Sequence, residues 1–207
     1  MTDTITLYAH KHASRAERCL WALDELALTY TLRRLDVSAG ETMHPEFRKI
    51  SPDGKLPALT HGERPMTESM PICEYLARLN PDAGLLPVSI DEQYHYGRLM
   101  HYLLTEVEMY LWVKAQAGFL KQLYPWPDGT SAFARGMAEK HINGIESLMG
   151  PDGFASCGRF TIADILLTQL LGWADASRVA VPDTLIDYRM RMLGRKQCPQ
   201  IMQPSSA

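Results

Sequence analysis

The sequence contains few cysteines, and their positions suit neither a disulfide framework nor a metal site. The four, among 207 residues, are Cys19, Cys73, Cys157 and Cys198. They are far apart, form no C-x-x-C pair and show no metal-ligand spacing with histidine. Small secreted domains that depend on disulfides carry cysteine at much higher density. We therefore expect a cytoplasmic protein that binds no metal.

Long apolar runs and runs of like charge are also missing. No apolar stretch reaches the ~18 residues needed to cross a bilayer, and the start, MTDTITLYAH, lacks the basic and apolar regions of a signal peptide. Lys and Arg number 21 against 24 Asp and Glu, a net charge of −3. This balance gives no basic patch for nucleic acid or for a membrane, so we expect neither as a partner.

With 46% hydrophobic and 22% charged residues, the composition is that of a folded globular protein. Its first part alternates between the two-residue period of strands and the 3.6-residue period of helices. Residues 4–9 and 30–35 predict strands. Between them, residues 14–28 predict a helix. Its apolar face is expected to hold Ala16, Cys19, Leu20, Leu23 and Ala27.

A hairpin and a second helix are predicted to complete this part. Residues 56–60 turn through His61-Gly62-Glu63 into residues 64–67. Ser69 is placed to cap a helix that carries Pro71 in its first turn, and Asn80-Pro81 stops it. The order is therefore strand, helix, strand, hairpin and helix.

Helical periodicity dominates after a linker at residues 81–87. We therefore expect one domain at residues 1–80 and an all-helical domain at residues 88–207. Two helices are predicted, from Asp91 to about Leu120 and from Ala132 to Met149. Their apolar stripes comprise Tyr96, Leu99, Leu103, Val107, Tyr110 and Leu111 in the first, and Phe133, Met137, Ile142, Ile145 and Leu148 in the second.

Thr161-Ile162-Ala163-Asp164 has the pattern of a helix capping box. In this motif the first and last side chains each accept a backbone N–H at the start of a helix. Phe160 and Ile165 stand at the positions of a hydrophobic staple. The helix that follows is apolar on nearly all sides, which predicts a central place in its domain. We assign Thr161 and Asp164 to folding rather than to chemistry.

Four segments taken together resemble the cytosolic glutathione transferase family, in particular its bacterial and fungal members with a Ser-Arg pair opening the first helix. They are residues 14–26, residues 51–59, Thr67-Glu68-Ser69 with Ile72 and Tyr75-Leu76, and residues 160–165. They occur in the family's order across nearly the whole chain. The resemblance implies a thioredoxin-like amino-terminal domain (βαβαββα), an all-helical bundle after it, and a homodimer.

The resemblance further implies a detoxification enzyme that conjugates reduced glutathione to hydrophobic electrophiles, with reduction of organic hydroperoxides as a second activity. Glutathione is then a co-substrate, and no cofactor is expected. Two alternatives stay open at this point. One is a non-catalytic binding or scaffold protein of the same fold. The other is a glutathione-dependent thiol reductase, which would need a cysteine near Ser14.

The resemblance makes Ser14 the residue that stabilises the glutathione thiolate. Lowering a thiol pKa by about two units requires ~2.7 kcal/mol of preference for the anion. A hydrogen bond to a charged group contributes roughly 1.5–3 kcal/mol, and a helix amino terminus roughly 0.3–1 kcal/mol. Ser14 at the opening of a helix is placed to supply both. The alternatives are that Ser14 only caps the helix and that Tyr8 supplies the hydroxyl.

The same resemblance assigns the glutathione contacts. Lys55 would meet the glycyl carboxylate, and Leu56, before a cis Pro57, would pair its main chain with the cysteinyl residue. Glu68 would bind the ammonium group of the γ-glutamyl end. Ser69 and the helix amides after it would hold the carboxylate of that end.

The electrophile pocket is expected between the two domains, along the long helix of the second domain. Its candidate residues are Glu106, Met109, Tyr110 and Trp112. For most of them, packing in the core is the alternative interpretation.

Overall fold

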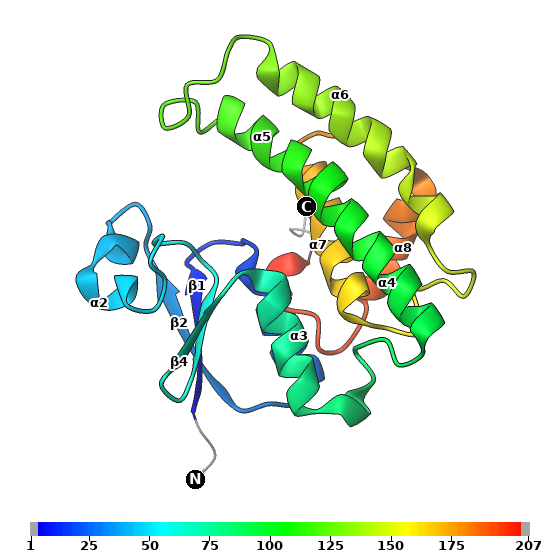
Figure 1. Ribbon diagram of the computed structural model, residues 1–207. Coiled ribbons are helices and arrows are strands. Elements are labelled where there is room, and N and C mark those ends of the chain that lie inside the picture. Colours follow the sequence, from blue (N-terminus) through cyan, green and yellow to red (C-terminus); the bar gives the residue numbers. More distant parts are fainter. Residues whose placement is uncertain (1–3, 204–207) are drawn as a thin grey trace. The chain divides into compact units, whose positions relative to one another are not determined.

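The computed structural model describes residues 4–203, which form two compact units (Figure 1). Of the described residues, the first unit comprises 4–86 together with 195–203, and the second comprises Pro87–Gly194. No helix in residues 4–203 is both long and apolar enough to span a membrane.

A four-stranded mixed sheet forms the centre of the first unit. Its strands are β1 (Ile5–His10), β2 (Tyr30–Leu35), β3 (Ala58–His61) and β4 (Arg64–Thr67), in the order β2-β1-β3-β4. β1 pairs in parallel with β2 and antiparallel with β3, which pairs antiparallel with β4. Pro65 lies in β4, an edge strand, where a missing N–H is tolerated. This topology confirms the predicted thioredoxin-like fold.

Helices cover both faces of the sheet. The first unit contains α1 (Ala16–Glu25), η1 (Glu41–Met43), α2 (Pro45–Arg48), α3 (Ser69–Leu79), η2 (Pro81–Ala83) and η5 (Gln200–Met202). α1 packs against α3 and β1, while α2 and α3 lie on opposite sides of the sheet (Figure 1).

The predicted apolar face of α1 is buried at Ala16, Cys19, Leu20 and Leu23, but the prediction for Ala27 is wrong. Ala27 lies beyond the end of the helix, in the left-handed region at φ 52°, and its side chain is exposed. The helix ends before the last position of the apolar pattern.

The carboxy-terminal segment differs from the boundary expected from the sequence. Residues 195–203 group with the first unit and not with the helical one. The Arg195 guanidinium donates to both carboxylate oxygens of Glu25 on α1, at 2.7 and 2.9 Å. This bidentate ion pair ties the segment to the sheet-containing unit.

The second unit is helical. Its elements are α4 (Ile90–Tyr102), the π-helical segment η3 (Leu103–Glu108), α5 (Met109–Ala117), α6 (Thr130–Asn143), η4 (Ile145–Leu148), α7 (Ile162–Ala176) and α8 (Asp183–Leu193). The single helix predicted from Asp91 to about Leu120 is thus interrupted by a π-turn. α8 was not predicted from the sequence.

The buried face of α6 also differs from the predicted one. Phe133, expected in the core, is 63% exposed, whereas Ala134, Ala138 and Ile142 are fully buried. α6 packs against α5, and two of its three buried residues are alanines. Alanine permits a close approach of two helices, and the bulkier aromatic ring remains outside.

α7 is the central helix of this unit, and the capping box begins it. The Asp164 carboxylate is fully buried and accepts from Thr161 N–H at 2.8 Å, Thr161 Oγ1 at 3.1 Å, Ala155 N–H at 2.8 Å and the Tyr188 hydroxyl at 2.8 Å. Burial nevertheless raises its pKa. Asp164 therefore joins the start of α7, the preceding loop and α8.

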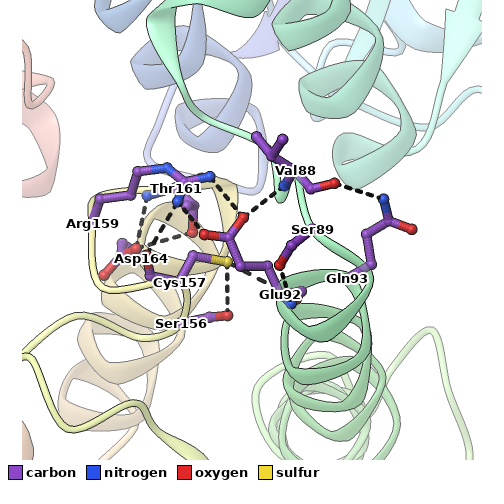
Figure 2. Close-up of polar contacts among 9 residues, drawn as sticks. All are labelled: Val88, Ser89, Glu92, Gln93, Ser156, Cys157, Arg159, Thr161 and Asp164. Atoms are coloured by element: carbon purple, nitrogen blue, oxygen red, sulfur yellow. Dashed lines mark hydrogen bonds and ion pairs between the residues drawn. The ribbon is translucent and has the colours of Figure 1, made fainter.

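A second polar contact links the start of α4 to the loop before α7 (Figure 2). Ser89 caps α4 by accepting Glu92 N–H, and Glu92 in turn accepts Val88 N–H at 2.7 Å. Arg159 donates to both Glu92 oxygens, at 2.5 and 3.1 Å. These contacts, chiefly that of Arg159, lower the pKa of Glu92 from 4.5 to about 2.

Replacing Asp164 by Ala should lower the free energy of unfolding by about 3 kcal/mol or more, because several buried donors lose their acceptor together. Tyr188→Phe is the matched control, since it removes one of these hydrogen bonds and keeps the ring; about 1–2 kcal/mol is expected. Urea unfolding measures both. Equal losses in the two variants would contradict the central role of the carboxylate.

Glu92→Gln should lower the melting temperature at pH 7. Because the pKa of Glu92 is depressed in the folded protein, its stabilising effect is complete above about pH 4.5 and is lost as the pH falls toward 2. The difference between variant and wild type should therefore shrink over that range. Glu46→Gln, which breaks an exposed pair with Lys49, is the control and should have little effect. Calorimetry at several pH values tests this, and a constant difference would contradict it.

Candidate functional site

Strand register brings three separate segments to one end of the sheet. Tyr8 of β1 pairs with Ala58 of β3, and Ala58 pairs with Thr67 of β4. The chain leaves β1 toward Ser14 at this end, enters β3 from Leu56-Pro57, and leaves β4 into Glu68-Ser69. Most of the predicted glutathione contacts therefore converge within the first unit.

Leu56 presents an open main chain at this end of the sheet. The Leu56–Pro57 peptide bond is cis, as the resemblance implied. Pro57 is buried and Leu56 is half-buried. Neither the N–H nor the C=O of Leu56 forms a hydrogen bond to any residue in the range 4–203. Such a donor and acceptor pair can extend the sheet by binding an extended peptide.

A tight turn fixes the backbone of Lys55. The buried Ser51 hydroxyl donates to Lys55 C=O at 2.9 Å and accepts Lys55 N–H at 3.1 Å. Gly54 has φ +64°, and a Cβ there would lie 2.9 Å from the Thr42 carbonyl oxygen, so the turn requires glycine. The Lys55 ammonium group is exposed and has no ion-pair partner among the described residues.

The start of α3 provides unpaired donors. Ile72 N–H donates to Glu68 C=O, and Pro71 has no N–H. The N–H groups of Ser69 and Met70 have no acceptor within the described part of the chain. Unpaired N–H groups at a helix amino terminus are the kind of donors to which anions bind in proteins, and the Ser69 hydroxyl lies beside them.

Glu68 has an unusual backbone conformation just before this helix. Its φ of 66° and ψ of 121° are strained for a residue with a Cβ. Its side chain is exposed, and its carboxylate has no partner in residues 4–203. Glu68 thus places a negative charge beside the positive end of α3.

Arg18, which the sequence pattern did not indicate as a site residue, donates a hydrogen bond to Ser69. Arg18 is 1% exposed, and its Nη1 donates to Ser69 Oγ at 3.2 Å. Periodicity places Arg18 opposite the apolar stripe of α1, where a charged residue is normally solvated. However, α1 is buried on all sides from Ala16 to Leu23. No sequence signal distinguishes Arg18 from a surface arginine.

Ser14 lies two residues before α1 and is half-buried. Its Oγ accepts Ala16 N–H at 3.2 Å, so the hydroxyl does stabilise the helix start. A hydroxyl that accepts can still donate its proton, and no acceptor for it exists within the described residues. Glu17 N–H and Arg18 N–H already bond to the carbonyls of Ser14 and Arg15, so the free donor at this position is mainly the Ser14 hydroxyl.

Tyr8, the alternative hydroxyl, lies on the sheet face opposite to the buried Ile5, Leu7 and Ala9. Its ring contacts Phe47 of α2, with ring centroids 5.6 Å apart. The Tyr8 hydroxyl has no hydrogen-bond partner in residues 4–203. Both hydroxyls therefore remain available as donors.

The four residues predicted for the electrophile pocket do not all contact the same neighbours. Glu106 lies 3.5 Å from His141 Nε2, and Tyr110 stacks on the same imidazole with centroids 5.6 Å apart. Trp112 instead contacts Tyr124 and Trp173 by its ring edge.

Met109, the fourth candidate, is 45% exposed. The structure thus brings Glu106 and Tyr110 together against α6 but not with Trp112.

Comparison with known proteins agrees with this geometry. Residues 3–78 match the family of the glutathione S-transferase, N-terminal domain. Glutathione S-transferase 1 of Dianthus caryophyllus is 33% identical over 92 residues, 44% of this chain and 42% of that protein. Glutathione S-transferase 1 of Schizosaccharomyces pombe is 28% identical over 165 residues, 77% and 71% of the two chains. The chain therefore spans less than half of the first relative and more than two thirds of the second.

A solved structure shares the fold. The glutathione transferase homologue from Sulfitobacter, with bound glutathione, aligns with a TM-score of 0.79 and 21% identity, covering 94% of this chain and 95% of the other. The family match assigns residues 3–78 to the glutathione S-transferase N-terminal domain family, the sequence relatives support the cytosolic glutathione transferase family, and the solved structure shows that the whole chain shares its fold.

Proposed function

We propose that this protein binds reduced glutathione at the sheet end of the first unit and conjugates it, through its sulfur, to hydrophobic electrophiles. The observation that carries the proposal is the convergence of open groups there. Five groups come to one end of the sheet: a main-chain donor and acceptor and an ammonium group without partners among residues 4–203, a carboxylate, and a helix amino terminus. Each matches a different group of the tripeptide.

The tripeptide would lie along this end in an extended form. Leu56 would pair with the cysteinyl backbone, as in the addition of a strand. Lys55 would bind the glycyl carboxylate at the other end of the ligand. At the γ-glutamyl end, Ser69 and Met70 would hold the carboxylate and Glu68 the ammonium group. The buried Arg18 guanidinium adds positive charge behind Ser69 and favours the carboxylate there.

The Ser14 hydroxyl would donate to the glutathione sulfur and so stabilise the thiolate. A hydrogen bond to an anion is worth roughly 1.5–3 kcal/mol, which corresponds to a pKa decrease of about one to two units. The cap bond from Ala16 N–H supports this role because it fixes the oxygen and polarises the hydroxyl.

The proposed reaction is a substitution or addition at an electrophilic carbon. The thiol proton leaves to solvent and the sulfur forms a bond to carbon. In a substitution the leaving group departs with its electron pair, and in an addition the neighbouring atom that receives the electron pair takes up a proton from solvent. Glu106, Met109, Tyr110 and Trp112 are the proposed residues for the electrophile. With a hydroperoxide, two glutathione molecules would be oxidised to the disulfide while the peroxide is reduced to alcohol and water.

The properties of the cysteines argue against a thiol reductase. Cys19 is the first cysteine after Ser14, and it is fully buried. Burial raises the pKa of its thiol well above the ordinary value, which disfavours the thiolate that disulfide exchange requires. Its Sγ donates to Ser69 C=O at 3.6 Å, and Cys73 Sγ donates to Cys19 Sγ at 3.9 Å. Both cysteines pack α1 against α3.

Replacing Ser14 by Ala should raise the pKa of the bound glutathione thiol by about one to two units and reduce kcat/KM near pH 6.5 by about 10- to 100-fold. Thiolate absorbance against pH measures the first effect. Conjugation of a nitro-activated aromatic halide measures the second. Tyr8→Phe is the matched control, since it removes the competing hydroxyl and should leave both values nearly unchanged.

The reverse result, with Tyr8→Phe raising the thiol pKa and Ser14→Ala not, would transfer the role to Tyr8. Glutathione binding by wild type with no conjugation of several electrophiles would instead favour a non-catalytic binding protein.

Replacing Glu68 by Gln should weaken glutathione binding about 10-fold or more, because a charge-assisted bond to the ammonium group is lost. Isothermal titration calorimetry measures the affinity. Glu63→Gln, at the exposed hairpin turn, is the control and should bind like wild type. Unaltered affinity of the Glu68 variant, with an unchanged melting temperature, would refute this assignment.

A further inference from the structure

The second unit contains a cavity of about 320 Å³ beside α6, α7, α8 and the loop after α7. Leu171, Val179 and Ile186 form apolar parts of its wall. Three arginines also line it: Arg135, Arg178 and Arg189. This volume is at the small end of the range for ligand pockets and has room for about ten water-sized groups.

Arg189 of α8 is a buried cation with incomplete partners. Its side chain is 15% exposed, and its buried Nε has no hydrogen-bond acceptor in residues 4–203. The carboxylate facing it belongs to Asp175, at 4.0 Å from Nη1, and that side chain is 76% exposed. A guanidinium held in this way retains capacity to bind an anion.

Gly172 makes the space for this guanidinium. A Cβ on Gly172 would lie 3.0 Å from Arg189 Nη2 and 3.2 Å from Nε, so the guanidinium lies directly against the α7 backbone. Glycine is disfavoured inside a helix, and Gly172 is four residues from the end of α7. α7 therefore carries a helix-destabilising glycine at the position where a larger residue would clash with the Arg189 guanidinium.

Arg178, at the same cavity, is a second residue with an unfavourable local conformation. It follows the end of α7 in the left-handed conformation, at φ 56°, a position that glycine usually occupies. The exposed Arg178 side chain instead lines the cavity. Residues that are unfavourable for their local backbone structure concentrate at functional sites. Here Gly172 makes room for the Arg189 side chain, and the left-handed Arg178 places its own side chain at the same cavity.

Among the described residues that line the cavity or pair with its arginines, positive charges exceed negative charges by one. Arg135 Nε donates to Glu139 Oε1 at 2.9 Å, and Ala180 N–H donates to the same oxygen at 3.3 Å. Asp175 is the other carboxylate. Three guanidinium groups thus stand against two carboxylates, beside an apolar wall.

We propose that this cavity binds a small organic monocarboxylate with an apolar body of about six to ten carbons. The carboxylate binds Arg189 and Arg178, and the apolar body contacts Leu171, Val179 and Ile186. All of these residues belong to the second unit, so the site is separate from the glutathione contacts of the first unit.

Calorimetric titration of the full chain with octanoate tests the proposal, with 1-octanol as the uncharged analogue. We expect saturable one-to-one binding of octanoate, at least 10-fold tighter than octanol. Saturating glutathione should not change it. No binding at millimolar octanoate, or equal binding of octanol, would overturn the proposal.

Variants locate the site. Arg189→Gln should weaken octanoate binding at least 10-fold. Gly172→Ala should weaken it at least fivefold by displacing the guanidinium. Gly136→Ala is the matched control, because a Cβ at this glycine within α6 would meet nothing within 4 Å. The octanoate affinity of this variant should stay within twofold of wild type.

Arg178→Gln tests the site independently if Arg189→Gln does not fold, and a loss of at least threefold is expected. Octanoate affinity that is unchanged in Gly172→Ala and Arg178→Gln would place the ligand elsewhere and overturn the proposal. Neither outcome bears on glutathione binding, which is measured separately.

Discussion

The site in the first unit depends on the hydrogen-bond register of β3 with its two neighbours. Because Ala58 pairs with both Tyr8 and Thr67, the segments that adjoin the three strands at this end come together. A slip of one residue would turn the side chains of β3 to the other face and move Leu56 away from the start of α3. Buried Leu59 and exposed Arg64 fix the faces of the hairpin, so core packing and site geometry share one constraint.

Local sequence patterns predicted much of this arrangement. Alternation and turn residues placed the strands, and Asn80-Pro81 placed the end of the helix at Leu79. The prediction that Ser69 caps this helix is wrong: Ser69 is its first residue, Glu68 is the N-cap, and no side chain caps the helix start. The spacing of Thr161 and Asp164 indicated the capping box that begins α7. Where periodicity failed, the reason was local geometry: the helix at Ala27 had already ended, and α6 buried its small residues in place of Phe133.

Features that depend on contacts between distant residues could not be predicted in this way. Arg18 is buried because helices and sheet surround α1, which its own periodicity does not reveal. The ion pair of Arg195 with Glu25 joins residues 170 positions apart. The pairing of Glu92 with Arg159 also depends on the fold of the second unit (Figure 2). Their charges are visible in the sequence, but their partners are determined only when the chain is folded.

The π-helical segment Leu103–Glu108 joins α4 to α5 in one continuous helix but rotates α5 about the helix axis relative to α4. Each extra residue in a helix rotates everything after it by about 100° around the axis. Glu106, within the segment, and Tyr110, just after it, both contact His141, whereas Trp112, two residues further along α5, contacts Trp173. Deletion of one residue in this segment would rotate all of α5 about the helix axis. The gain or loss of a single codon would therefore change which side chains of α5 face α6 and which face α7.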